Sequence, residues 1–185
     1  MNIVETALPG VLIIEPRVFD DARGYFLERF NLQRYAAFGI PGEGLRFVQE
    51  NATRSHRGVL RGLHFQVHRP QGKLFSVSNG RVFDVVADVN PDSPTFLQWI
   101  STELSDDNHR QMWVPPGYAH GFCVLSATAD VYYRCTDYFD PDDAGGVSWE
   151  DPQLGIAWPI DTPLLSDRDK GLRTLADTPR DRLPQ

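Results

Sequence analysis

Long apolar runs, cysteines and basic leader segments are all scarce or missing in this 185-residue chain. No hydrophobic stretch approaches the ~20 residues that a membrane-spanning helix needs, and the N-terminus lacks the basic start and apolar stretch of a signal peptide. We therefore expect a cytoplasmic protein with no membrane contact. The two cysteines, Cys123 and Cys135, do not make a disulfide framework, and we interpret both as reduced core residues.

Basic residues are outnumbered by acidic ones, since 18 Lys and Arg against 25 Asp and Glu give a formal net charge of −7. A nucleic-acid-binding surface needs a basic stripe, so this balance argues against a general nucleic-acid partner. It leaves room for a small anionic ligand, because a few arginines in one pocket can override the global sign. The length suits one buried core rather than two domains. We expect a single domain over residues 1–185, with a loose tail at 177–185.

Short runs rich in Val, Ile, Phe and Tyr recur between turn signals, and the 14 prolines and 15 glycines favour many short elements. The sequence predicts an all-β sandwich or antiparallel barrel with a few short helices. Asn31 is predicted to cap a short helix that runs to Phe38, and Asn79-Gly80 to turn a β-hairpin. The predicted strands are 11–15, 24–30, 47–53, 59–66, 74–77, 82–89, 97–103, 111–114, 121–125 and 130–135.

Two glycine-flanked histidines, His64 and His120, are separated by predicted strands. This arrangement resembles the double motif of cupins and implies a cupin-type antiparallel jelly-roll barrel. In metal-binding cupins the first motif is usually His-x-His followed by Glu, whereas this chain has HFQ at 64–66. Two imidazoles make a poor divalent site, which needs three or four ligands. Even with His68 as a replacement ligand, we expect no bound metal.

The segment 59–74 brings Arg61, His64 and Lys73 close together in sequence. Strict alternation along a strand would turn Arg61 and His64 to opposite faces. If both serve one site, a bulge or bend near Gly62 must reset the register, which is a common use of a strand glycine. We predict such an irregularity.

A series of motifs from about residue 3 to residue 169 resembles, in order, the dTDP-4-dehydrorhamnose 3,5-epimerase family. The motifs are PRVF-x-D-x-RG at 16–24, FVQEN at 47–51, VLRGLHFQ at 59–66, QGKL at 71–74, VFDVVADV at 82–89, SPTF-x-QW at 93–99, PxGxAHGF at 115–122, YRCTDY at 133–138 and PLLS-x-x-D at 163–169. The resemblance implies a substrate with a nucleotide diphosphate and a 4-keto-6-deoxy sugar.

The resemblance also implies catalytic roles. Protons on C3 and C5 flank the C4 ketone, so inversion needs a base on one face, an acid on the other and a group facing the oxyanion. His64 resembles the base and Asp169 its orienting carboxylate. Lys73, one of only two lysines, resembles the group that faces the C4 oxygen, and Tyr133 resembles the acid.

The nucleotide part of the implied substrate needs residues that bind it. Arg23 and Arg61 resemble diphosphate clamps, because guanidinium pairs bidentately with phosphate, and His120 would add a donor to the same anion. Alternatively, His120 only holds a loop.

Other binding roles follow from the resemblance alone. Glu28, Gln49 and Asn51 resemble groups that read the base and the sugar. Tyr138 would stack on thymine, and Arg168 stands where family members often have a lysine.

Some patterns leave alternatives open. Asp84, inside an apolar strand, needs a partner and is either a second orienter of a catalytic group or structural. Pleat alternation sends only one of Tyr132 and Tyr133 inward. Phe19 and Phe26 line the nucleotide pocket or belong to the core.

We expect an epimerase that inverts C3 and C5 of dTDP-4-dehydro-6-deoxy-D-glucose. No cofactor is implied, because the substrate ketone is the electron sink. The resemblance implies a homodimer, with an N-terminal strand exchanged between partners. The alternatives are a C3- or C5-monofunctional epimerase for a natural product, a metal-dependent cupin, and a non-catalytic binder of sugar nucleotides.

Overall fold

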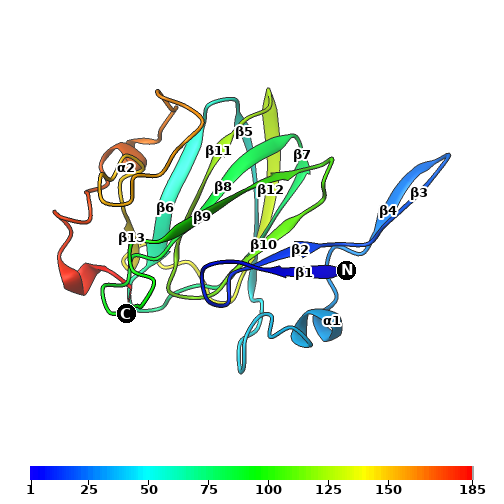
Figure 1. Ribbon diagram of the computed structural model, residues 1–185, viewed down its shortest axis with the longest axis horizontal. Coiled ribbons are helices and arrows are strands. Elements are labelled where there is room, and N and C mark those ends of the chain that lie inside the picture. The colour runs from blue at the N-terminus through cyan, green and yellow to red at the C-terminus, as the bar shows by residue number, and fades with distance from the viewer. Residues whose placement is uncertain (185) are drawn as a thin grey trace.

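The computed structural model describes residues 1–184 and consists of two antiparallel sheets packed face to face (Figure 1). The six-stranded sheet has the order β1 (Asn2–Glu5), β2 (Leu12–Glu15), β10 (Gln111–Val114), β7 (Lys73–Asn79), β12 (Thr128–Cys135) and β5 (Gln49–His56). The five-stranded sheet has the order β13 (Ala144–Gly146), β6 (Leu60–Gln66), β11 (Ala119–Val124), β8 (Arg81–Ala87) and β9 (Trp99–Ser105). The predicted all-β jelly-roll architecture is confirmed.

Apolar side chains from the inner faces of the two sheets form the central core. Val82 and Val86 from β8 pack in one cluster with Phe75 and Val77 from β7. Within each strand these residues are an even number of positions apart, so their side chains point to the same face of the sheet. Phe122, from β11, extends the same cluster.

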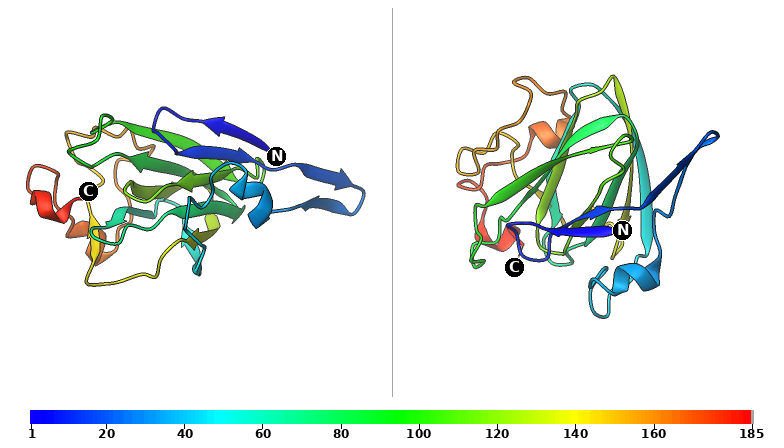
Figure 2. Two further views of the ribbon diagram at one scale, coloured as in Figure 1. Left: turned by 90° about the horizontal axis from the view of Figure 1, so that it is seen from below. Right: turned by 45° about the vertical axis from the view of Figure 1, so that its right-hand side comes forward.

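Both outer faces are partly covered by segments that lie outside the sheets. Tyr35 of α1 (Leu32–Ala36) packs with Trp113 over the six-stranded sheet. The segment after β13 covers the five-stranded sheet, and Leu154 and Leu175 are buried there. This C-terminal coil lies at the end of the molecule opposite the N-terminal hairpin (Figures 1 and 2).

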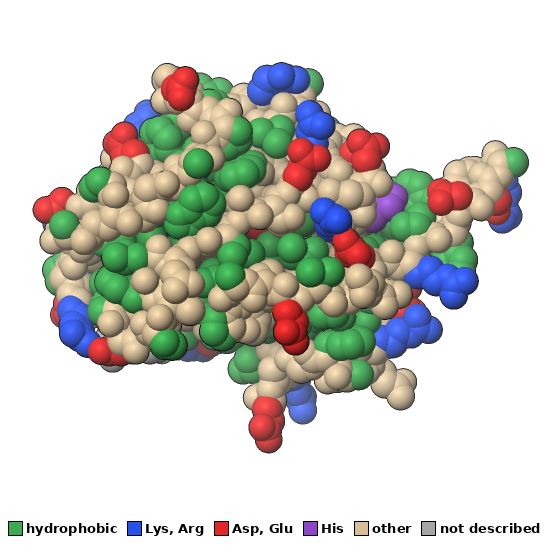
Figure 3. Space-filling view, viewed as in Figure 1, with side chains coloured by type: hydrophobic (Ala, Val, Ile, Leu, Met, Phe, Trp, Pro, Cys, Tyr) green, Lys and Arg blue, Asp and Glu red, His purple; other side chains and the backbone are tan. Residues whose placement is uncertain are grey.

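The hairpin of β3 (Val18–Asp21) and β4 (Gly24–Leu27) belongs to neither large sheet. It stands clear of the body of the molecule (Figure 3). Phe19 and Phe26 are directly opposite each other on the hairpin and both are exposed. Within this chain neither belongs to a core cluster, and Phe26 lines a small pocket beside the hairpin together with Ser76 and His109.

Every one of the ten predicted strands overlaps an observed strand, and β1, β3 and β13 are additional. Asn31 caps α1 by accepting from the Arg34 backbone N–H, as predicted, although the helix ends at Ala36. The predicted hairpin at Asn79-Gly80 is wrong, because β7 and β8 lie in different sheets and the turn carries the chain between them.

The end of the chain was expected to be loose from residue 177. The structure forms a 3-10 helix, η1 (Arg180–Arg182), in this segment, and Leu183 is 4% exposed in the outer cluster. Gln185, the last residue of that segment, lies outside the described residues. Cys123 and Cys135 are free and buried, as expected. In the described part of the chain, no helix is long and apolar enough to cross a membrane.

Candidate active site

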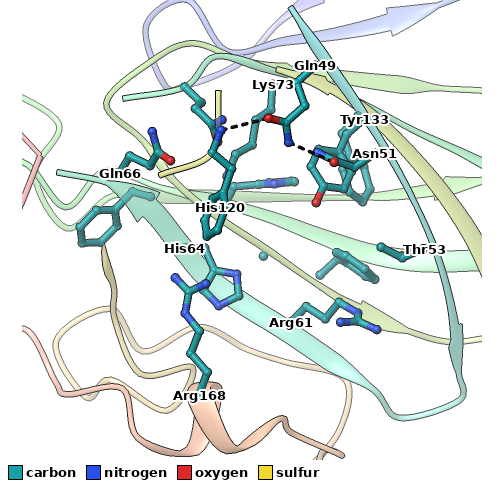
Figure 4. A pocket seen from close by; sticks show the side chains of 16 residues that line it. Gln49, Asn51, Thr53, Arg61, His64, Gln66, Lys73, His120, Tyr133 and Arg168 are labelled. Atoms are coloured by element: carbon teal, nitrogen blue, oxygen red, sulfur yellow. Dashed lines mark hydrogen bonds between the residues drawn. The ribbon is translucent and has the colours of Figure 1, made fainter. Parts of the chain in front are cut away.

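A cavity of about 330 Å³ opens between the two sheets (Figure 4). Strands β5, β7 and β12 of one sheet and β6 and β11 of the other form its walls. Its floor is continuous with the core, because Phe75 and Phe122 belong to both. The lining residues are Gln49, Asn51, Thr53, Arg61, His64, Phe65, Gln66, Gln71, Lys73, Phe75, His120, Gly121, Phe122, Tyr133, Phe139 and Arg168.

Strand β6 is irregular at Gly62, as the positions of Arg61 and His64 required. The register between β6 and β11 shifts next to this residue, and the Gly62 φ of +118° is one that side chains rarely adopt. A Cβ at Gly62 would lie 2.6 Å from the Gly121 Cα. The irregularity lets both Arg61 and His64 line the cavity, and the predicted reset of the register is confirmed.

His64 is held by Asp169 from outside the sheet. The His64 Nε2 lies 2.5 Å from the Asp169 Oδ1. Asp169 belongs to α2 (Asp167–Lys170), and the N-cap of this helix, Ser166, donates its hydroxyl to the Asp169 Oδ2 at 2.7 Å. Both carboxylate oxygens are therefore occupied, which fixes the orientation of the imidazole.

The protonation states of this pair follow from its surroundings. Burial lowers the pKa of His64, and the hydrogen bond that His64 donates to Asp169 only partly opposes this effect. Burial acts to raise the pKa of Asp169, but the hydrogen bonds from His64 and Ser166 bring that pKa below its ordinary value. At neutral pH the pair is a neutral imidazole beside a carboxylate, which is the state that a base requires.

His120 is the direct cross-strand partner of His64. Its Nε2 lies 2.9 Å from the Asp84 Oδ2 and 3.1 Å from the Oδ1, and Asp84 is fully buried. The Phe75 ring packs edge-on against the His120 imidazole, with 4.9 Å between centroids. The partner that Asp84 requires is therefore His120.

Lys73 begins β7 and reaches the same cavity. Its neighbour on β12 is Cys135. Burial lowers the pKa of Lys73, and no hydrogen bond to a residue in the range 1–184 offsets this effect. The ammonium is thus a desolvated donor that faces a space able to hold a ligand oxygen.

Tyr133 faces the cavity from β12, which is in the sheet opposite to that of His64. Its ring stacks on Phe75 with 6.0 Å between centroids. Burial raises the pKa of Tyr133, so the phenol is protonated at neutral pH. Tyr132 points outward, where the Arg29 guanidinium lies 5.2 Å from its ring centroid.

Five predicted binding residues also line the cavity, namely Gln49, Asn51, Arg61, His120 and Arg168. Gln49 donates to the Asn51 Oδ1 at 3.1 Å, and the Arg61 Nε donates to the buried Ser55 hydroxyl at 3.1 Å. Arg168 is drawn beside His64 in Figure 4, and its charge contributes to the lowered pKa of His64.

Three other predicted binding residues lie outside the cavity of their own chain. Arg23 is at the tip of the projecting hairpin, with its side chain 90% exposed and paired with Asp21. Glu28 follows the hairpin and pairs with Arg34. Tyr138 is 62% exposed beside the cavity mouth and is not among the lining residues.

Three glutamines shape the mouth of the cavity, a role that no sequence motif indicated. Gln49, Gln66 and Gln71, from three different strands or their ends, each make a hydrogen bond of 2.7–3.0 Å to the backbone of residues 137–140. We call residues 137–140 the rim loop. Its Phe139 lines the cavity. The motifs HFQ and QGKL contain two of these glutamines, but nothing in their pattern indicates a distant loop as partner.

The cavity does not have the donor set of a metal centre. Over residues 1–184, no group of three or more His, Cys, Asp or Glu side chains is arranged to hold a metal ion. The two cavity histidines are each bonded through Nε2 to a separate aspartate.

The family model of dTDP-4-dehydrorhamnose 3,5-epimerase matches residues 5–177. The chain belongs to this family. The dTDP-4-dehydrorhamnose 3,5-epimerase of Pseudomonas aeruginosa is 48% identical over 179 residues, which cover 96% of this chain and 97% of that protein. The dTDP-6-deoxy-D-glucose-3,5-epimerase of Legionella pneumophila, solved in complex with dTDP-4-keto-L-rhamnose, matches with a TM-score of 0.94. It is 46% identical, and the match covers 100% of this chain and 97% of that one.

Members with a narrower name also resemble this chain. The dTDP-4-dehydrorhamnose 3-epimerase of Streptomyces niveus is 40% identical over 179 residues, which cover 96% of this chain and 85% of that protein. The family and enzyme class predicted from the sequence are confirmed.

Proposed function

We propose that this protein inverts C3 and C5 of dTDP-4-dehydro-6-deoxy-D-glucose and yields dTDP-4-dehydro-L-rhamnose. One observation carries the proposal: His64 and Tyr133 face a single cavity from opposite sheets. Inversion at a carbon requires that a proton leaves one face and that another arrives on the opposite face. A base and an acid on facing walls meet this requirement.

In the proposed reaction His64 is the base. Its Nε2 is engaged by Asp169, so Nδ1 is the ring nitrogen free to accept a proton. When the imidazole becomes charged, the Asp169 carboxylate stabilises the imidazolium. The electron pair of the broken C–H bond moves toward C4, and an enolate forms. The substrate ketone is the electron sink, so the reaction calls for no cofactor.

Lys73 would stabilise the oxygen that becomes negative in this enolate. A desolvated ammonium interacts with a developing charge far more strongly than a hydrated one does. Its lowered pKa also reflects an environment in which a neighbouring negative charge is favourable.

Tyr133 would return the proton from the other face. Burial raises its pKa, which keeps the phenol protonated and able to donate. A nearby cation favours the phenolate that remains, and the charge of Arg61 acts in this direction on the Tyr133 pKa. His64 then releases the proton it took to solvent, and Tyr133 regains a proton from solvent.

The nucleotide would be held by the remaining polar residues. Arg61 and His120 suit the diphosphate, while Gln49 and Asn51 suit polar atoms of the base and sugar. Arg168, at the start of α2, adds positive charge at the same mouth. Tyr138, exposed in the rim loop, would stack on the thymine ring where it emerges.

We further propose a homodimer in which the projecting hairpin completes the partner's site. Arg23 lies on that hairpin, away from its own cavity, and the exposed Phe19 and Phe26 flank it. Glu28 follows directly. Since β1 pairs with β2 of its own chain, we assign the exchange to the hairpin rather than to the N-terminal strand. A cytoplasmic location remains part of the proposal.

The test is incubation with dTDP-4-dehydro-6-deoxyglucose in heavy water, followed by mass spectrometry and NMR of the sugar. Deuterium at both C3 and C5, with inversion at both, is the expected result. Label and inversion at one carbon only would assign the narrower activity named for the Streptomyces niveus relative. Folded protein that binds dTDP but incorporates no label would refute the proposed chemistry.

A further inference from the structure

The hydroxyl of Thr53 is buried without a hydrogen-bond partner. Among residues 1–184, its Oγ1 is the one buried side-chain nitrogen or oxygen that has none. Burial of a hydroxyl without a hydrogen bond is unfavourable. A buried hydroxyl without a hydrogen bond in a native fold calls for an explanation, such as a strained site or a ligand group that binds there.

Thr53 stands in the cavity wall, on the inner face of β5 (Figure 4). The inward residues of this strand are polar throughout, at Gln49, Asn51, Thr53 and Ser55. Asn51 accepts a hydrogen bond from Gln49, and Ser55 accepts one from Arg61. Thr53 lies between these two bonded pairs, and its hydroxyl is the one in the row without a hydrogen-bond partner among residues 1–184.

The neighbours of Thr53 show where a partner must come from. Its cross-strand partner on β12 is Val131, which offers no polar side-chain atom. Two residues along β5, Ser55 binds the guanidinium of Arg61, a group suited to phosphate. In the other direction, Asn51 is the cross-strand partner of Tyr133. The hydroxyl therefore lies between the group suited to the diphosphate and the group suited to the sugar.

We propose that Thr53 is a further substrate-binding residue, whose hydroxyl donates a hydrogen bond to an oxygen in the sugar–diphosphate part of the bound sugar nucleotide. The inference rests on the proposed function and extends it to a residue that no motif indicated. Substrate binding then satisfies the buried hydroxyl, so the contact discriminates in favour of ligands with an oxygen at this point.

The first test is Thr53→Val, which exchanges the hydroxyl for a methyl group. We expect the dissociation constant of dTDP-glucose and the KM of the keto sugar substrate to rise about 3- to 10-fold for a neutral acceptor. More than a roughly tenfold rise is expected for a charged acceptor. The kcat should change little, because the contact is the same in the ground state and the transition state. Thr53→Ser keeps the hydroxyl and should retain wild-type affinity.

The stability of the same variant separates a binding role from a structural one. Removal of an unsatisfied hydroxyl should raise the melting temperature of the free protein by about 2–4 °C, while affinity falls. Thr128→Val is the matched control, because Thr128 is a half-buried strand residue outside the cavity. This control should leave affinity and KM unchanged.

Two probes identify the acceptor. A loss of affinity for both dTDP and dTDP-glucose assigns the contact to the diphosphate, and a loss for dTDP-glucose alone assigns it to a sugar hydroxyl. Unchanged binding of both, with unchanged KM, overturns the proposal, and so does a Thr53→Ser variant as weak as Thr53→Val. A wild-type protein that binds neither nucleotide and exchanges no deuterium overturns the proposed function itself, and Thr53 with it.

Discussion

His64 and His120 are direct cross-strand neighbours, and each is bonded through Nε2 to an aspartate. The two pairs differ in their access to a ligand, since the His64 side chain is 28% exposed and that of His120 is 5% exposed. They also differ in support, because Asp169 has Ser166 on its second oxygen whereas both oxygens of Asp84 face His120. The accessible pair suits proton transfer. In the buried pair, the side chains of His120 and Asp84 are hydrogen-bonded to each other.

His120→Phe should therefore destabilise the fold. It would leave the Asp84 carboxylate buried without its partner, and the loss of one member of a buried pair costs about 3–5 kcal/mol. Urea denaturation followed by circular dichroism gives the free energy of unfolding. The double variant His120→Phe with Asp84→Leu should recover most of the loss, because it removes the buried charge. A single variant less than about 1 kcal/mol below wild type in its free energy of unfolding would contradict this reading of the pair.

Tyr133→Phe should separate proton removal from inversion. His64 remains to abstract the proton, so deuterium should still enter the sugar from heavy water, but on the original face. His64→Ala should abolish the exchange while leaving the affinity for dTDP nearly unchanged. Tyr132→Phe is the matched control, since Tyr132 points away from the cavity. Full inversion by Tyr133→Phe would remove this residue from the mechanism.

The acid limb of the pH profile of kcat/KM should move in opposite directions in two variants. In the proposed mechanism His64 acts as the neutral base, so activity is lost as the pH falls through its pKa, which burial holds below its ordinary value. Asp169 raises this pKa and Arg168 lowers it. Asp169→Asn should thus shift the limb to lower pH, with a reduced rate, and Arg168→Gln should shift it to higher pH.

The exposed Arg173 provides a comparison for that profile, since it does not line the cavity. Arg173→Gln should leave the limb where it is. Shifts of the two test variants in the same direction would show that His64 is not the titrating group.

Mixing two inactive variants should restore activity if Arg23 serves the partner's cavity. One variant carries Arg23→Glu and the other His64→Ala. In a mixed dimer, the chain with an intact His64 would receive the intact Arg23 of its partner, so one of the two sites is complete. An equal mixture should therefore recover about a quarter of wild-type activity. No recovery, with mixed dimers verified by mass spectrometry, would show that Arg23 does not act across an interface.

The fold could be predicted to a large extent because its strands are strongly patterned. One of the strands missed is β13, whose Ala-Gly-Gly sequence is a poor indicator of a strand. The Asn79-Gly80 turn shows a different limit. Turn chemistry indicates that the chain reverses, but it does not say that the two strands will join different sheets.

The site was predictable where a motif demanded a specific geometry, as at Gly62. On β5 only Gln49 and Asn51 were predicted, through the family resemblance, because the residues at 49, 51, 53 and 55 are all polar. A polar residue at every second position normally indicates the solvent face of a strand. Here that face turns toward the cavity, so Thr53 was not recognised as part of the wall, nor Ser55 as the partner of Arg61. The hydrogen bonds of the rim loop were missed because they join residues far apart in sequence.

If the projecting hairpin completes the site of a partner chain, as proposed, the amount of protein governs its own activity. A site completed by a second chain exists only in the associated form, so its abundance depends on mass action between chains. Turnover per chain should then fall when the protein is diluted below its dimer dissociation constant and recover when it is concentrated. At such dilution the rate would grow with the square of protein concentration rather than in proportion to it.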